Sequence, residues 1–262
     1  MDLRLSVSKT KTFLHCKLQY KYLYLEKLPR KEHDFHTFGK LLHKVLEDFH
    51  LAYINGSLEP YNIEMGNAFK KALQEYSGKI NKEQKKEAKE IATEYLKQIT
   101  ANKKSGKIPT FLAAEKDFSL KIENNDSAII LNGCIDRTQI DTDGVIHVAD
   151  YKTTKNKKYL QNDWFQLLTY ALVLYTEDPS ITKIRGSYIL LRHNLESITK
   201  EFSIDEILEA RESYFKYAEQ ILNEKEFGPS PSFLCRWCDA YNVCKSGGYS
   251  VEKDMNFGET DW

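Results

Sequence analysis

The sequence has no excess of charge of either sign. Lys and Arg together number 38, and so do Asp and Glu, so the formal net charge at pH 7 is zero. The charge of the whole chain therefore argues neither for nor against a nucleic-acid partner. Only local groups of charged residues can indicate such a partner.

The chain also lacks long apolar runs, which excludes the usual membrane-spanning helix. No stretch approaches the roughly 18 to 20 apolar residues of a membrane span. Residues 1–10 lack the apolar segment of a signal peptide. There is no internal repeat and no low-complexity linker. These absences predict a soluble, cytoplasmic protein without a membrane partner, in a compartment where structural disulfides do not persist.

The sequence does contain enough apolar material for a sizeable core. Apolar residues make up 41% of the 262 residues, with 13 Phe and 16 Tyr among them. This length predicts one domain, or one domain with an added lobe.

Apolar residues recur with helical spacing in the first part of the chain and alternate after Pro109. The expected helices cover 8–28, 35–55, two segments of 60–107 that separate near 77–78, 163–176 and 204–224. The expected strands cover 111–122, 128–140, 145–151 and 184–192. This order predicts an α/β fold with a mixed central sheet flanked by helices. We divide it into a helical N-terminal lobe at 1–108, a core at 109–226 and a cysteine-rich segment at 227–262.

Two aspartates and a lysine stand on the expected hairpin. Alternate side chains of a strand share one face, so Asp150 and Lys152 project together. Asp136 lies on the neighbouring strand, where pairing can bring its carboxylate close to Asp150. Two close carboxylates favour a hard cation such as Mg²⁺ or Mn²⁺. Such an ion would activate a water and polarise a phosphodiester, with Lys152 assisting.

An isolated Asp-x-Lys is more often a strand end and a surface lysine than a catalytic site. The loop that follows supports the catalytic interpretation, because residues 153–158 are basic and rich in hydroxyls and suit phosphate contacts. Lys155 is its candidate DNA-binding residue.

Four of the five cysteines are arranged like metal ligands. Cys235, Cys238 and Cys244 form C-x2-C-x5-C, and Cys16 on the first expected helix is the obvious fourth ligand. Zinc and an iron–sulfur cluster are about equally compatible with the local spacing. Cys134 lies within an expected strand, where a buried small apolar role is the simpler interpretation.

Several motifs together resemble a known family. G-x-I-D-R at 133–137 and D-Y-K-T at 150–153 resemble the PD-(D/E)XK nuclease core of RecB-like enzymes, and 39–43 resembles their helix with a metal-ligating histidine. The resemblance implies a restriction-endonuclease-like fold with metal ligands at His43, Asp136, Asp150 and the carbonyl of Tyr151. Gln166 and Tyr170 resemble the family's Q-x-x-x-Y motif, whose one-turn spacing would direct both residues to the cleft and its DNA. Glu115 matches a common acidic position.

One N-terminal cysteine far from a C-terminal triplet resembles the iron–sulfur staple of AddB-type nucleases and CRISPR-associated RecB-like exonucleases. This resemblance implies a [4Fe–4S] cluster at Cys16, Cys235, Cys238 and Cys244 that joins the two ends of the chain, with zinc as the less favoured occupant.

The implied function is a metal-dependent DNA exonuclease that acts on single strands or free ends, in repair, recombination, CRISPR adaptation or viral DNA processing. The sequence has no G-x-x-x-x-G-K-[ST] motif, so a helicase partner would be a separate chain. CRISPR adaptation proteins are the other expected partners. The alternative is a non-catalytic module that binds DNA ends or supports assembly while keeping the fold and cluster. A zinc-stapled protein unrelated to nucleic acid is the third hypothesis.

Overall fold

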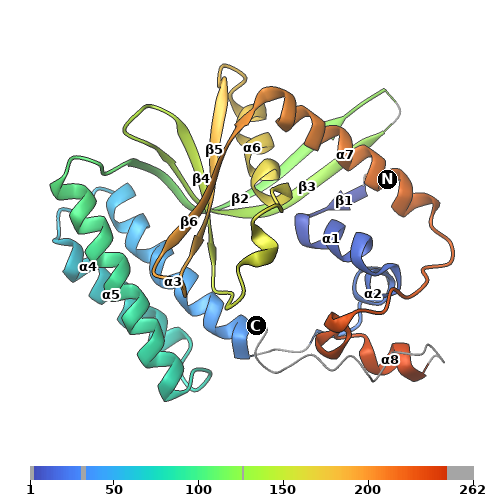
Figure 1. The fold of residues 1–262 in the computed structure, drawn as a ribbon, viewed down its shortest axis with the longest axis horizontal. Coiled ribbons are helices and arrows are strands. Elements are labelled where there is room, and N and C mark those ends of the chain that lie inside the picture. Colours follow the sequence, from blue (N-terminus) through green and yellow to red (C-terminus); the bar gives the residue numbers. More distant parts are fainter. Residues whose placement is uncertain (1–2, 31–33, 126, 247–262) are drawn as a thin grey trace. The chain divides into compact units, whose positions relative to one another are not determined.

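The computed structural model describes residues 3–30, 34–125 and 127–246. The chain divides into two compact units, and each is described by itself. Figure 1 labels the helices and strands of both units. The first comprises Met1–Lys31, Ser119–Gly133 and Arg211–Trp262. The second comprises Glu32–Phe118 and Cys134–Ala210. In the described part of the chain, no helix is both long and apolar enough to cross a membrane.

The second unit is built on a mixed sheet. Its strands are β3 (Ala128–Ile140, from Cys134 onward), β4 (Ile146–Lys152), β5 (Lys183–Leu190) and β6 (Glu196–Ser203), and β2 (Thr110–Glu123, up to Phe118) pairs with β3. The β3–β4 and β5–β6 pairs are antiparallel, whereas β4 and β5 are parallel. A parallel pair needs a crossover, and helix α6 (Phe165–Glu177) lies within it. The mixed sheet predicted from the sequence is confirmed.

Helix α6 packs closely on one face of this sheet because of a glycine. A Cβ atom at Gly186 of β5 would lie 2.6 Å from the Phe202 ring and 3.2 Å from the Leu167 Cβ. Only glycine therefore lets strand β6 and helix α6 both approach β5 at this point.

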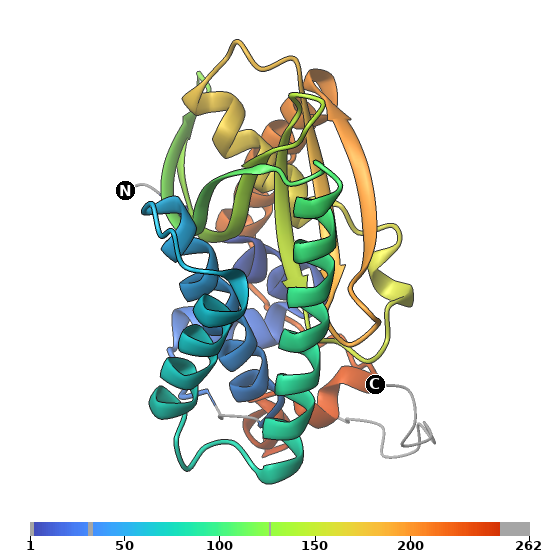
Figure 2. The ribbon, with the colours of Figure 1, turned by 90° about the vertical axis from the view of Figure 1, so that its left-hand side faces the viewer.

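Helices α3 (Asp34–Ile54), α4 (Tyr61–Glu75) and α5 (Lys82–Lys104) form a layer of the same unit (Figure 2). The predicted apolar stripe of α3 is buried throughout: Phe38, Leu41, Leu42, Val45, Leu46 and Phe49. It shares one core with the inner faces of α4 and α5 and with Ala149 and Tyr151 of β4. A capping box of Asn81 and Gln84 begins α5.

In the first unit, the expected continuous helix at 8–28 is wrong. Strand β1 (Leu3–Leu5) runs parallel to the start of β3, and Ser6 caps helix α1 (Val7–His15). The helix stops at Cys16, whose backbone is extended at φ −154° and ψ 108°. Helix α2 (Lys17–Tyr20) then begins and continues as a π-helical turn, η1 (Lys21–Leu25). The Cys16 sulfur accepts the Gln19 amide and so caps α2.

The C-terminal part of this unit follows α7 (Ile204–Asn223) and contains η3 (Phe233–Trp237) and α8 (Tyr241–Ser246). It packs against the N-terminal segment. The Leu18 amide donates to the Gly228 carbonyl at 3.2 Å, and the rings of Tyr20 and Phe227 stack at 6.4 Å. Residues 247–262 of the predicted cysteine-rich segment lie outside the described residues. The N-terminal segment and the segment after α7 are therefore in direct contact.

Candidate metal and active site

The two aspartates face one another across β3 and β4. Arg137 is paired with Ala149, so the antiparallel register places Asp136 beside Asp150. Both are almost fully buried, with 7% and 2% of their surface exposed. The Asp136 carboxylate also accepts the Tyr151 backbone amide at 2.7 Å. Burial and the neighbouring Asp150 carboxylate raise the pKa of Asp136.

Helix α3 brings His43 to the same place. Its Nδ1 lies 3.5 Å from Asp136 and 3.3 Å from Glu115 Oε1, and its Nε2 lies 3.0 Å from the Tyr151 carbonyl oxygen. Burial alone would lower the pKa of His43. The carboxylates of Asp136, Glu115 and Asp150 outweigh burial and raise this pKa to about 9.

Glu115 reaches the site through an unusual backbone conformation. Its φ is +45°, a region that side-chain-bearing residues seldom adopt, although it lies within β2. The thiol of Cys134 donates to its second carboxylate oxygen at 3.3 Å. Burial alone would raise the pKa of Glu115, and the hydrogen bond to His43 holds it below the usual value. Strain of this kind is concentrated at functional sites in proteins.

These side chains fit a hard divalent cation. One ligand atom each from His43, Glu115 and Asp136 lies within 4.8 Å of the other two. The Tyr151 carbonyl oxygen lies beside this group, because it is within hydrogen-bond distance of His43 Nε2. An imidazole with carboxylate and carbonyl oxygens suits Mg²⁺ or Mn²⁺. The raised pKa of Asp136 shows a buried acidic pair that a cation would stabilise.

Asp150 is the centre of a second set of contacts. Lys152 Nζ lies 2.6 Å from Asp150 Oδ2, and the Gln166 amide nitrogen donates to Oδ1 at 2.6 Å. The Gln166 carbonyl oxygen accepts from Lys152 at 2.9 Å, and the Tyr170 hydroxyl lies 3.3 Å from Asp150. Gln166 and Tyr170, four residues apart on α6, therefore hold the Asp150 carboxylate. The sequence predicted that both residues would bind DNA or support the active site.

A cavity of about 650 Å³ opens beside the candidate metal-binding residues. Its lining includes His36, Lys40, His43 and Thr153. Helix α3 approaches the loop after β4 closely here, because a Cβ atom at Gly39 would lie 3.2 Å from the Thr153 hydroxyl oxygen. The predicted basic loop therefore borders the cavity through Thr153. Lys155 is exposed and is not among the lining residues.

The five cysteines lie in both units, Cys134 in the second and the other four in the first. All five are free thiols and partly exposed. Cys134 was expected to be a buried apolar residue, and this expectation is wrong because its thiol is half-exposed and hydrogen-bonded to Glu115.

The other four cysteines belong to the first unit. The Cys16 sulfur accepts the amides of Gln19 and Ser230, each at 3.5 Å, and the Cys235 sulfur accepts that of Ser232 at 3.3 Å. Burial raises the pKa of Cys238 to about 11, and the thiols of Cys16 and Cys235 contribute to the rise. The N-terminal cysteine and the C-terminal group therefore lie close enough to interact.

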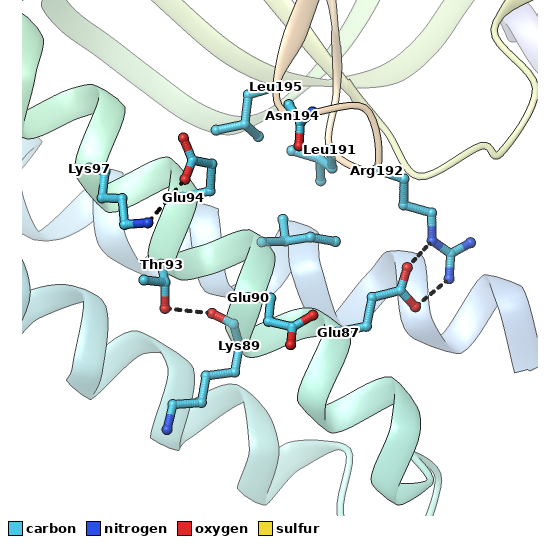
Figure 3. A pocket seen from close by; sticks show the side chains of 11 residues that line it. Glu87, Lys89, Glu90, Thr93, Glu94, Lys97, Leu191, Arg192, Asn194 and Leu195 are labelled. Carbon is cyan, nitrogen blue, oxygen red and sulfur yellow. Dashed lines mark hydrogen bonds and ion pairs between the residues drawn. The ribbon is translucent and has the colours of Figure 1, made fainter.

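A separate cavity of about 510 Å³ lies between α5 and the turn after β5 (Figure 3). Glu87 forms an ion pair with Arg192 at 2.7 Å, and Glu94 forms one with Lys97 at 3.4 Å. Charged groups of this cavity thus compensate one another, and none of the candidate metal-binding or catalytic residues lines it.

The sequence reasoning missed a buried polar network behind the site. Arg137, which follows Asp136, lies 7% exposed and donates through Nη1 to the hydroxyls of Tyr95 and Tyr151, the latter at 2.8 Å. His50 Nε2 completes the network at 2.7 Å from the Tyr95 hydroxyl. The G-x-I-D-R motif could have indicated this network, because strand alternation places Arg137 on the face opposite Asp136.

Sequence and fold comparisons relate this chain to known proteins. The chain is 27% identical over 242 residues to one of the subunits of the ATP-dependent helicase/deoxyribonuclease of Streptococcus agalactiae, in serotypes Ia, V and III alike. The match covers 86% of this chain and 22% of those relatives, so the chain spans about a fifth of their length.

A similar fold occurs in the crystal structure of a putative exonuclease from Eubacterium rectale. It has a TM-score of 0.53 and 16% sequence identity, and the match covers 96% of this chain and 90% of that one. The model of the PD-(D/E)XK nuclease superfamily matches residues 4–245. The chain therefore belongs to the PD-(D/E)XK nuclease superfamily.

Proposed function

We propose that this nuclease is a divalent-metal-dependent deoxyribonuclease that acts on single strands or free ends of DNA. The observation that carries the proposal is the convergence of His43, Glu115 and Asp136 within 4.8 Å of one another, beside the Asp150–Lys152 ion pair. A full set of acidic residues and lysine is what hydrolysis requires, and a module that only binds DNA has no need of it.

His43, Glu115, Asp136 and the Tyr151 carbonyl would hold the ion, with Asp150 completing the set. A bound Mg²⁺ or Mn²⁺ lowers the pKa of a coordinated water and polarises the phosphodiester. Lys152 is placed by Asp150 and Gln166, so its ammonium group can offset the negative charge that builds on the phosphate. Gln166 and Tyr170 fix the Asp150 carboxylate, which keeps it aligned with the attacked phosphate.

DNA as the substrate is supported by the deoxyribonuclease relative and by the hydroxyl-bearing and basic side chains beside the site. The cavity of about 650 Å³ lies within the range of small-molecule sites and is large enough for a nucleotide. We propose a helicase as partner on the basis of the same relative, with CRISPR adaptation proteins as an alternative. Repair, recombination, CRISPR adaptation and viral DNA processing are the settings in which such an activity serves.

We also propose a [4Fe–4S] cluster at Cys16, Cys235, Cys238 and Cys244. Backbone amides donate to the sulfurs of Cys16 and Cys235, and such bonds stabilise thiolates that bind clusters. The arrangement of one N-terminal cysteine and a C-terminal triplet supports the cluster over zinc, because it resembles the iron–sulfur staple of AddB-type nucleases.

The test of the nuclease compares the wild type with Asp150→Asn on single-stranded DNA labelled at either end, with Mn²⁺ and with EDTA. We expect metal-dependent cleavage by the wild type and by the exposed control Asp205→Asn, and none by Asp150→Asn. Equal cleavage by Asp150→Asn would show that the assigned site is wrong. DNA-end binding without any cleavage by the wild type would favour the non-catalytic module.

A further inference from the structure

A second cavity in the same unit lies on the opposite face of the sheet from Asp136. It has a volume of about 250 Å³. Its lining includes Arg137 and Gln139 of β3, Lys107, and Gln98 and Asn102 of α5. Most of these side chains carry hydrogen-bond donors, and two carry a positive charge. The wall is therefore suited to a negatively charged ligand.

The positive charge of Arg137 is only partly compensated. Its guanidinium is always protonated in proteins, and only 7% of the residue is exposed. Among the described residues, no carboxylate lies within salt-bridge distance, and the partners of Nη1 are the hydroxyls of Tyr95 and Tyr151 and the imidazole of His50. These groups are neutral hydroxyls and a histidine whose pKa burial and Arg137 hold well below its usual value.

Two residues that line the cavity also have side-chain polar atoms without hydrogen-bond partners. The Nε of Arg137 and the Oε1 of Gln139 are buried and make no hydrogen bond in the described structure. A buried cation without a paired charge costs several kcal/mol, so proteins seldom keep one without a reason. The faces of Phe111 and Tyr151 lie 5.6 and 5.5 Å from the guanidinium carbon and offset only part of this cost.

Asp141, which also lines the cavity, attracts Arg137 electrostatically but lies beyond salt-bridge distance from it. Its carboxylate is engaged by Arg185 and by His147, whose Nδ1 lies 3.0 Å away. The Gln139 amide donates to Asp141 as well, at 2.6 Å. These contacts hold the pKa of Asp141 below its usual range against the effect of burial. Asp141 therefore compensates only part of the charge of Arg137, and the rest is available to a ligand.

We propose that this cavity binds an oxyanion of the phosphate class, with Arg137 as its main contact and Lys107 at the mouth. The volume is below the roughly 300 Å³ of common small-molecule sites, which favours a compact ion with a few waters over an extended strand. A free phosphate and the terminal phosphate of a nucleotide share this chemistry. Arg137 also donates to the hydroxyl of Tyr151 on β4, so its side chain connects the anion site to the strand that carries the Tyr151 carbonyl.

The test measures phosphate binding by isothermal titration and by melting temperature on metal-free protein in EDTA, at constant ionic strength against chloride. We expect the wild type to bind one phosphate. Arg137→Met should bind about 10- to 100-fold more weakly, because hydrogen bonds to a charged group are lost. It should melt no lower than the wild type in phosphate-free buffer, because an apolar side chain of similar volume replaces a buried charge that has no salt-bridge partner.

Two further variants localise the ion. Lys107→Glu, at an exposed position, should weaken binding even if Arg137→Met fails to fold, whereas Lys152→Ala, on the other face, should bind like the wild type. Deoxyadenosine 5′-monophosphate distinguishes a nucleotide-borne phosphate from the free ion, and deoxyadenosine should not bind. The proposal is overturned if the wild type binds no phosphate, if Lys107→Glu or a folded Arg137→Met binds with wild-type affinity, or if binding is lost only in Lys152→Ala.

Discussion

Replacing Gln166 by leucine removes the side chain that holds both Asp150 and Lys152. Three hydrogen bonds are lost: one to Asp150 at 2.6 Å, one to the Tyr170 hydroxyl at 2.7 Å and one from Lys152 at 2.9 Å. Leucine is apolar and similar in size, so the packing of α6 is largely kept. The variant therefore tests the orientation of the acidic group apart from the fold.

The size of the effect follows from the bond to the charged partner. A hydrogen bond to a charged group contributes about 1.5 to 3 kcal/mol, and Asp150 is too buried, at 2% exposure, for solvent to replace it. If one such bond is lost in the transition state, kcat falls by about 10- to 150-fold. The ion pair between Lys152 and Asp150 at 2.6 Å persists, which keeps the loss below that of removing Asp150 itself.

The assay is single-turnover cleavage of end-labelled single-stranded DNA at saturating Mn²⁺, with melting temperature measured in parallel. Gln220→Leu, at an exposed position of α7, is the matched control and should cleave like the wild type. A Gln166→Leu enzyme that cleaves within twofold of the wild-type rate would refute the reasoning, because Asp150 would then need no orienting partner.

Three other expectations concern the fold and the cysteines. Burial and Arg137 keep the pKa of His50 well below its usual value, so it is neutral when folded. Its unfolded form takes up a proton below about pH 6.5, and stability falls by up to about 1.4 kcal/mol per pH unit there. Urea unfolding at pH 5 and 7 should show a smaller loss in His50→Gln, and an equal loss would contradict this. Gly186→Ala should destabilise by about 1 to 3 kcal/mol, because its Cβ would lie 2.6 Å from the Phe202 ring. Gly66→Ala should instead stabilise the protein by about 0.5 to 1 kcal/mol, because the added Cβ within α4 would meet no other atom within 4 Å. Equal melting temperatures of the two glycine variants would contradict both expectations. Cys238→Ser should lose the visible absorbance and iron of anaerobically purified protein while Cys134→Ser keeps both, and iron retained in Cys238→Ser would count against the cluster.

The sequence predicted those parts of the fold that local pattern controls. The stripe of α3 and the burial of β4 follow from apolar spacing, and the hairpin fixes Asp136 beside Asp150. Strand β6 was missed because it is largely exposed and polar, and β1, of three residues, is too short to show a pattern.

Other features depend on tertiary contacts that no local pattern encodes. The break at Cys16 separates α1 from α2 although the surrounding residues favour a helix. The φ of +45° at Glu115 places its carboxylate on His43, and a strand pattern assigns that residue an ordinary extended backbone. The contact of Gln166 with Asp150 depends on how α6 packs on the sheet, so spacing along the chain predicts the helix face of Gln166 but not its partner.

We propose that His43, Glu115 and Asp136 hold one catalytic divalent ion. The most direct measurement is titration of Mn²⁺ into metal-free wild-type protein and Asp136→Asn, with DNA cleavage followed in the same samples. We expect one site in the wild type, at which occupancy and cleavage rise together, and loss of both in Asp136→Asn. Cleavage by EDTA-treated wild type, or wild-type Mn²⁺ affinity and cleavage in Asp136→Asn, would contradict it.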